Sequence, residues 1–187
     1  MSKSDISIAL LHYPVLNKNG ETGSSAVTNL DIHDIARLSR TYGLKNYYIV
    51  TPLQDQKNLV KKIVEHWTIN KGGQVNPDRK EALGIVKICD SIDDVKNNFL
   101  KDELSPVLIS TTAVKKKDSI EMETLKEMIS DKGKHFLIIL GTAWGLAEEI
   151  FEKSDYVLEP VETGSDYNHL SVRSAASIII DRLLSDR

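Results

Sequence analysis

The sequence predicts an α/β fold with a mostly parallel sheet of about six strands and helices on both faces. Short apolar runs recur along the chain, and segments with helical periodicity separate them. This alternation is typical of a parallel sheet joined by crossover helices. The clearest run, Phe136–Leu140, consists only of large apolar residues. A strand that is buried on both faces has this pattern.

The predicted strands follow from apolar runs of suitable length. Ile6–Leu11 and Phe136–Leu140 are continuous runs and therefore predict buried central strands. Tyr47–Val50 combines aromatic and β-branched residues, and Pro52 follows it, so we expect a strand that stops there. Three shorter runs complete the predicted sheet: Ile85–Cys89, Val107–Ser110 and Tyr156–Leu158.

The predicted helices carry apolar residues at helical spacing. Leu30–Tyr42 has Leu30 and Leu38 on one face, with Asn29 as its expected N-cap. Ser171 is the expected N-cap of the closing helix, Ser171–Leu184. The others are Gln54–Trp67, Ile92–Leu100, Glu121–Ile129 and Leu146–Phe151. Lys71–Glu81 is polar, with paired glycines and a proline, and predicts a flexible excursion between elements.

The length of 187 residues and an apolar fraction of 41% fit one globular domain covering residues 1–187. A membrane helix needs a longer apolar run than any present, and Met1–Asp5 does not begin a secretory signal, so we expect a cytoplasmic protein without membrane contact. The single cysteine, Cys89, excludes an internal disulfide and a cysteine-built zinc site. No His, Asp or Glu group has metal-ligand spacing, so we expect no metal. The net charge of −3 argues against a uniformly basic surface but leaves room for local basic patches, such as Lys57, Lys61 and Lys62, or Lys115–Lys117.

Three loops follow predicted strands, and ligands of open α/β sheets bind outside the carboxyl ends of strands. These candidate loops are Thr111–Ser119, Gly141–Gly145 and Glu159–Asn168. In Leu140–Gly145 the glycines allow a close approach of the backbone to a ligand, or simply a tight turn from strand to helix. The run has neither the ending of a phosphate-binding P-loop nor the glycine spacing of a dinucleotide site.

Two further segments are unusually polar for core helices. Asp166–Ala176 places Asn, His, Ser and Arg at the start of a helix and then continues with small residues that permit close packing. Asn29–Arg40 mixes apolar positions with histidine and arginine. Within it we single out Arg37, because a guanidinium holds a phosphate with paired donors. The alternative for this helix is a solvated face with internal ion pairs.

Together these segments resemble the SPOUT superfamily of S-adenosylmethionine-dependent RNA methyltransferases, and most of all its small single-domain bacterial branch. The resemblance extends from end to end, and its matching strings are His12–Val15, Asn17–Lys18, Ala26–Arg37, Arg40–Gly43, Leu140–Leu146 and Asp166–Ala175. It implies that the C-terminal segment threads through a loop to form a deep trefoil knot. It also implies a homodimer, an RNA substrate (tRNA or rRNA), and S-adenosylmethionine bound at the knot.

The resemblance also implies roles for individual residues. Arg37, Ser171 and Arg173 occupy the positions expected to be catalytic. Glu159 is the residue expected to hold a ribose hydroxyl of the cofactor. The full set expected to bind the cofactor is Thr111, Thr112, Leu140, Gly141, Thr142, Gly145, Leu158, Glu159, Pro160, His169, Leu170 and Ser171.

Three positions depart from the pattern of ribose-methylating relatives. Asp31 stands where those relatives have asparagine, Ser171 where many have asparagine, and Arg173 where they have serine. These departures argue against ribose methylation and leave methylation of a base, or an unusual substrate, open. Two alternatives remain: a noncatalytic knotted RNA-binding or assembly factor, and a flavodoxin-like nucleotide-binding module that would lack the usual phosphate-binding loop.

Overall fold

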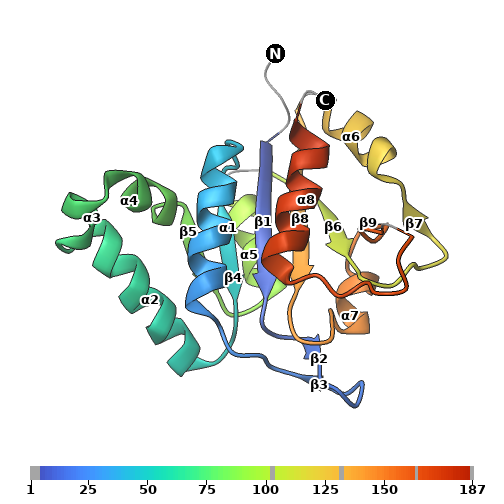
Figure 1. Cartoon of the computed structure of the whole chain (residues 1–187), viewed down its shortest axis with the longest axis horizontal. Coiled ribbons are helices and arrows are strands. Elements are labelled where there is room, and N and C mark those ends of the chain that lie inside the picture. The colour runs from blue at the N-terminus through green and yellow to red at the C-terminus, as the bar shows by residue number, and fades with distance from the viewer. Residues whose placement is uncertain (1–4, 102–103, 131–132, 163, 186–187) are drawn as a thin grey trace.

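A computed structural model describes residues 5–101, 104–130, 133–162 and 164–185. Its centre is a seven-stranded sheet in which all strand pairs are parallel, in the order β5-β4-β1-β8-β6-β9-β7 (Figure 1). The strands are β1 (Asp5–Leu11), β4 (Tyr47–Val50), β5 (Val86–Cys89), β6 (Pro106–Thr111), β7 (Ser119–Ile120), β8 (His135–Gly141) and β9 (Tyr156–Leu158). The predicted α/β class and parallel sheet are confirmed.

The sheet has one strand more than the six expected. The extra strand is β7, at the edge, where its two residues pair with β9. Such a short strand carries too little sequence signal to be separated from a loop. A small antiparallel pair, β2 (Val15–Leu16) and β3 (Thr22–Gly23), lies outside the main sheet, within the segment that follows β1.

Helices cover both faces of the sheet. They are α1 (Asn29–Thr41), α2 (Gln54–Thr68), α3 (Gly72–Val75), α4 (Pro77–Leu83), α5 (Ile92–Leu100), α6 (Met122–Ser130), α7 (Glu148–Glu152) and α8 (Val172–Leu184). Figure 1 shows α1 and α8 side by side on the near face, with α1 in front of β4 and α8 in front of β8. The predicted helices on both faces are confirmed.

The alternation of side chains along β1 creates two cores, because successive residues of a strand point to opposite faces. Ile8 and Leu10 pack with α1, α6 and α8, whereas Ala9 and Leu11 pack with α5 and α7. These four side chains have no exposed area. Burying a leucine or isoleucine side chain stabilises the folded state by about 1.5–3 kcal/mol, so the two cores fix where the carboxyl end of β1 lies.

Three local predictions are wrong, and each has a physical reason. The N-cap of α1 is Thr28, not Asn29, because the Thr28 side chain accepts the N–H of Asp31 at 3.1 Å. The stretch expected to be a flexible excursion forms α3 and α4, and the Asn76 side chain caps α4 by accepting the Arg79 N–H at 2.9 Å. The helix expected from Leu146 starts at Glu148, because Leu146 forms a bridge to Val15.

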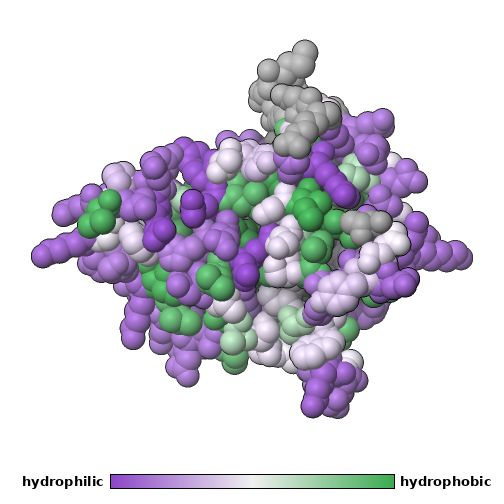
Figure 2. Space-filling view, viewed as in Figure 1, coloured by the Kyte–Doolittle hydropathy of each residue, from purple (hydrophilic) through white to green (hydrophobic). Residues whose placement is uncertain are grey.

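The surface of the near face is mostly hydrophilic, with hydrophobic residues gathered over α1 and α2 (Figure 2). Among the described helices, none has the length and apolar character needed to cross a membrane. Within the same residues, side chains of His, Cys, Asp and Glu form no group of three or more that is placed to hold a metal ion. The trefoil knot stays a prediction of the family resemblance.

Candidate functional site

The carboxyl ends of three neighbouring strands bring the predicted cofactor loops together. Strands β8, β6 and β9 are adjacent, and Thr111 at the end of β6 is paired with Leu158 at the end of β9. Their following loops therefore leave the same edge of the sheet (Figure 1). Asn168 Nδ2 donates to the Ala113 carbonyl oxygen at 3.1 Å and ties the last loop to the first. The grouping of these loops, expected from the sequence, is present in the structure.

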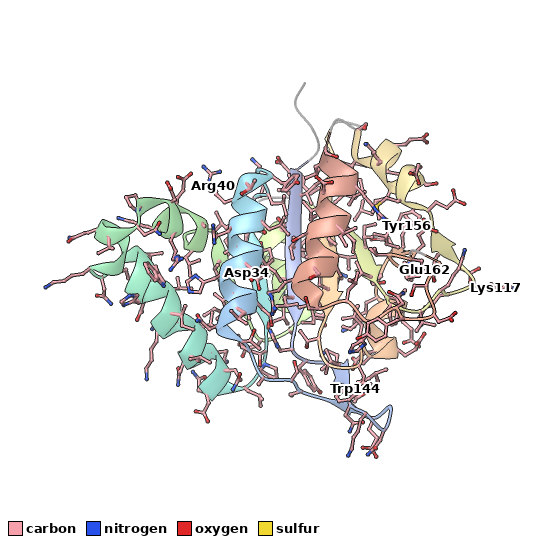
Figure 3. All side chains as sticks on the ribbon, viewed as in Figure 1. Asp34, Arg40, Lys117, Trp144, Tyr156 and Glu162 are labelled. Atoms are coloured by element: carbon pink, nitrogen blue, oxygen red, sulfur yellow. The ribbon has the colours of Figure 1, made fainter. Side chains whose placement is uncertain are left out.

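The turn after β8 has a strained, tightly held backbone. A Cβ added to Gly141 would lie 2.9 Å from the Leu146 amide nitrogen, so only glycine fits there without movement. Ala143 and Gly145 both have positive φ angles, 53° and 111°. An alanine in this region is uncommon, and such strain clusters at ligand sites. The side chain of Trp144, at the tip of the turn, is 65% exposed (Figure 3).

A buried chain of hydrogen bonds holds the same turn from below. Thr142 Oγ1 donates to the Leu11 carbonyl oxygen at 2.9 Å and lies 2.5 Å from Ser25 Oγ. Ser25 Oγ in turn lies 3.0 Å from His12 Nδ1. His12 is fully buried, and burial lowers its pKa from 6.5 to about 4, so its ring is neutral near pH 7. No local pattern in the sequence singles out His12 as part of the site, because only the fold places it beneath the turn.

The remaining predicted cofactor residues divide into buried and accessible groups. Leu140, Leu158 and Pro160 are buried and form apolar walls. His169 and Leu170 are exposed, and the His169 ring lies 6.3 Å from that of Tyr167. Leu170, which is 44% exposed, is therefore an apolar member of this set that a ligand can reach.

Polar side chains at the strand ends are partly committed to local bonds. Thr111 Oγ1 donates to the Ile139 carbonyl oxygen at 2.9 Å, and Thr112 Oγ1 bonds within its own turn. Glu159 Oε1 accepts the Met122 N–H at 3.3 Å, at the start of α6. Its Oε2 atom has no hydrogen bond within the described part of the chain and is free to accept from a ribose hydroxyl. The donor and acceptor set of these loops therefore fits a nucleoside.

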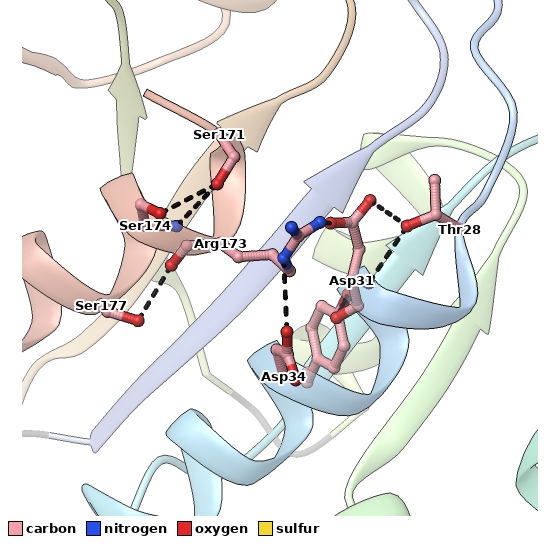
Figure 4. Close-up of polar contacts among 8 residues, drawn as sticks. Thr28, Asp31, Asp34, Ser171, Arg173, Ser174 and Ser177 are labelled. Carbon is pink, nitrogen blue, oxygen red and sulfur yellow. Dashed lines mark hydrogen bonds and ion pairs between the residues drawn. The ribbon is translucent and has the colours of Figure 1, made fainter. Parts of the chain in front are cut away.

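The start of α8 is fixed to α1 by charge (Figure 4). Ser171 caps α8 by accepting the Ser174 N–H, as the sequence predicted. Arg173 Nη1 donates to Asp31 Oδ1 at 3.1 Å, and Arg173 Nε lies 3.3 Å from Asp34 Oδ2. The Thr28 hydroxyl donates to the other Asp31 oxygen at 2.6 Å. Asp31 is buried, and these partners satisfy both of its carboxylate oxygens.

Arg37 lies on a different surface of α1 from the one that contacts Arg173. It is exposed on α1 and lines two adjoining grooves with residues of α2 and α4. Among the described residues, no hydrogen bond or ion pair joins Arg37 to Ser171 or Arg173. The three residues expected to be catalytic therefore lie on two sides of α1, with Ser171 and Arg173 on the side of α8.

Each of the two lysine patches noted in the sequence contains lysines that are held in ion pairs. Lys116 Nζ lies 2.9 Å from Glu148 and 3.8 Å above the Phe151 ring, which pins its loop to α7. Lys57 pairs with Asp90 at 2.8 Å. The ammonium groups of Lys57 and Lys116 are therefore already paired and are not free to contact an RNA phosphate.

Comparisons with known proteins identify the family to which this chain belongs. A family model described as SAM-dependent RNA methyltransferase matches residues 5–185. A tRNA (guanine-N(1)-)-methyltransferase of Nitratidesulfovibrio vulgaris is 41% identical over 178 residues, which cover 95% of this chain and 41% of that protein. A protein of Aquifex aeolicus is 35% identical over 186 residues, covering 99% of this chain and 91% of the relative. The chain thus spans less than half the length of the first relative and nearly all of the second.

Two solved structures have the same fold. The SpoU methyltransferase AviRb from Streptomyces viridochromogenes, in complex with its cofactor AdoMet, has a TM-score of 0.63 at 11% identity, covering 98% of this chain and 58% of that one. The TrmH/SpoU tRNA modifying enzyme of A. aeolicus has a TM-score of 0.60 at 16% identity, covering 98% and 76%. The family match and the fold lead to one conclusion: this chain belongs to the S-adenosylmethionine-dependent RNA methyltransferases and shares the fold of the SpoU-type enzymes.

Proposed function

We propose that the protein methylates a base of tRNA, with N1 of guanine as the first candidate acceptor. Two relatives at 41% identity, from Nitratidesulfovibrio vulgaris and Oleidesulfovibrio alaskensis, are named for that reaction. This chain covers only 41% of the length of each of those proteins. We therefore propose, on the basis of these relatives, that this chain catalyses the same reaction.

One observation favours a base over a ribose hydroxyl as acceptor. Two of the three positions at which the sequence departs from ribose-methylating relatives, Asp31 and Arg173, form one ion pair with a length of 3.1 Å. Each residue is satisfied by the other, so neither presents the neutral asparagine and serine groups of the ribose-methylating pattern. A paired, partly buried guanidinium is suited to holding helices in place rather than to removing a proton.

In this proposal the chain's own residues align the reactants. When bound, S-adenosylmethionine supplies an electrophilic methyl group. Leu158 and Leu170 enclose its adenine, Glu159 accepts from its ribose, and the turn at Gly141 keeps side chains out of the slot. Arg173 acts as a positioning residue, since it fixes the start of α8 against α1. Methyl transfer is a displacement at carbon, for which alignment is the main requirement.

We also propose a cytoplasmic homodimer. Its support is the group of exposed apolar side chains at the site, Trp144 (65% exposed) and Tyr167 (74% exposed). Large exposed apolar groups beside a site are typical of a surface that another subunit covers. Sedimentation equilibrium on the wild type and on Trp144→Glu tests this, with a shift toward monomer expected in the variant.

Calorimetry and a methyl-transfer assay test the proposed function together. We expect S-adenosylmethionine and S-adenosylhomocysteine to bind the purified protein, and ATP and FMN not to bind. With methyl-labelled cofactor, label is expected in tRNA and not in rRNA. Binding of FMN alone would support the flavodoxin-like alternative, which the family match disfavours. Cofactor and RNA binding without transfer to any RNA class would identify a noncatalytic factor and contradict the proposal.

A further inference from the structure

A basic groove lies on the side of α1 that faces away from α8. We call it the α1–α2–α4 groove and define it by His33 and Arg37 of α1, Lys62 and Trp67 of α2, and Arg79 of α4. Its volume is about 470 Å³. Arg37 and Arg79 also line a second groove of about 460 Å³ beside Arg40, so the two form one continuous depression along α1. Figure 3 shows Arg40 near the C-terminal end of α1, and Asp34 nearer its start.

The cations of this groove are largely unneutralised. Arg40 is paired with Glu81, but among the described residues Arg37 and Lys62 take part in no ion pair. Asp34 also lines the groove, but its carboxylate is paired with Arg173. The remaining acidic side chain is Asp78, at the start of α4. The groove is therefore locally positive on a chain whose net charge is −3.

Two buried nitrogen atoms in the groove lack partners. Arg79 Nε and His33 Nδ1 are buried and make no hydrogen bond in the structure's described part. Buried polar atoms in folded proteins nearly always have a partner, so each unsatisfied one calls for an explanation. Both atoms are shielded from a ligand in the groove, which Arg79 would instead contact through its terminal guanidinium nitrogens.

Like charges converge on His33. Its pKa is lowered from 6.5 by burial and by the guanidinium groups of Arg79 and Arg37, which Asp34 only partly offsets. Arg79 lies 4.5 Å from the centre of the Trp67 ring, and the His33 ring meets the same indole edge-on at 5.8 Å. The indole thus holds the Arg79 guanidinium in place without neutralising it, and it also contacts the His33 ring. A fixed cluster of positive groups is the electrostatic arrangement that an anion favours.

We propose that the α1–α2–α4 groove binds a backbone phosphate of the RNA substrate, held between the guanidinium groups of Arg37 and Arg79. The inference rests on the proposed function, because RNA is the polyanion that this family methylates. Arginine supplies paired N–H donors that match phosphate oxygens. Asp34 links this groove to the candidate active site, since it lines the groove and contacts Arg173 at 3.3 Å.

The α3–α4 segment gains a role from this inference. It supplies Arg79, and its two buried glycines allow it to pack closely on α2, where Gly72 lies against His66. A Cβ at Gly72 would lie 2.7 Å from the His66 carbonyl oxygen. The segment that was expected to be flexible therefore forms one wall of the α1–α2–α4 groove.

The test measures binding of a tRNA transcript by fluorescence anisotropy at several salt concentrations, together with calorimetry for S-adenosylmethionine. The variants are Arg37→Gln and Arg79→Gln. The matched control is Lys61→Gln, which removes one charge from α2 outside the groove. We expect each groove variant to weaken RNA binding by roughly 10-fold and to reduce the salt slope by about one. Lys61→Gln should change both values little, and all variants should bind the cofactor normally.

Several outcomes separate this inference from the proposed function. Arg37 is exposed, so Arg37→Gln remains informative if Arg79→Gln fails to fold. If Arg37→Gln and Arg79→Gln have the same RNA affinities and salt slopes as Lys61→Gln, the groove does not bind the RNA. This result would overturn the inference even if the wild type methylates tRNA. Loss of RNA binding in the groove variants supports the groove even if the wild type transfers no methyl group. Displacement of the tRNA by poly-glutamate as readily as by unlabelled tRNA would point to an acidic protein partner and overturn the RNA assignment.

Discussion

Arg173 and Asp31 are 142 positions apart in the sequence, and the structure joins them through Nη1 and Oδ1 at 3.1 Å. Both are departures from the ribose-methylating pattern. Their contact shows that the two departures form one compensating unit, in which a buried carboxylate is neutralised by a guanidinium from the next helix. Removing one partner of a buried pair leaves an uncompensated charge, whereas removing both does not.

A double-mutant cycle tests this unit. Arg173→Ser should lower the free energy of unfolding by about 1–3 kcal/mol, because Asp31 then keeps only its Thr28 partner. The Arg173 side chain is 32% exposed, and we therefore expect less than a fully buried pair would lose. Adding Asp31→Asn should recover part of that loss. Urea unfolding of the four proteins measures the coupling, and strictly additive effects would show that the two residues act independently.

Substitution of Gly141 should damage the cofactor turn. Gly141→Ala forces its Cβ against the Leu146 amide, and we expect a loss of about 1–3 kcal/mol of stability with weaker binding of S-adenosylmethionine. Gly23→Ala is the matched control, because nothing lies within 4 Å of a Cβ there. Calorimetry and thermal unfolding measure both effects. Equal cofactor affinity in the two folded variants would remove the Gly141 turn from the binding site.

Stability should depend on pH through His12. Its pKa is about 4 in the folded state and 6.5 in the unfolded state, so the unfolded chain binds the extra proton between these values. Stability should therefore be full above pH 6.5 and fall as the pH drops toward 4, by on the order of 3 kcal/mol. Unfolding of the wild type and of His12→Asn at pH 7.5, 6 and 5 isolates the contribution of His12 to the pH dependence of the free energy of unfolding. Parallel pH profiles would mean that His12 does not titrate as the structure indicates.

The central fold was predictable because buried parallel strands leave continuous apolar runs. Tyr47–Val50 and Tyr156–Leu158 have the predicted bounds, and Ile6–Leu11 differs by one residue. The α3–α4 segment was missed because glycine and proline are also typical of loops, and its helices depend on packing against α2. Tertiary contacts override local propensity at such positions.

The site was predictable only in outline. Loops after adjacent parallel strands must meet at one edge, so the grouping of Thr111, Gly141 and Leu158 followed from topology. The His12–Ser25–Thr142 chain and the Arg173–Asp31 pair join residues far apart in the sequence, and no local pattern shows them. The same holds for the neighbourhood of Arg37, whose groove is completed by Arg79.

The most direct measurement of the central claim is nucleoside mass spectrometry of a tRNA transcript incubated with the protein and isotopically labelled S-adenosylmethionine. The account predicts a labelled methyl group on a base, with 1-methylguanosine as the expected nucleoside. A labelled 2′-O-methyl nucleoside, or no labelled nucleoside with a protein that binds both cofactor and tRNA, would contradict it.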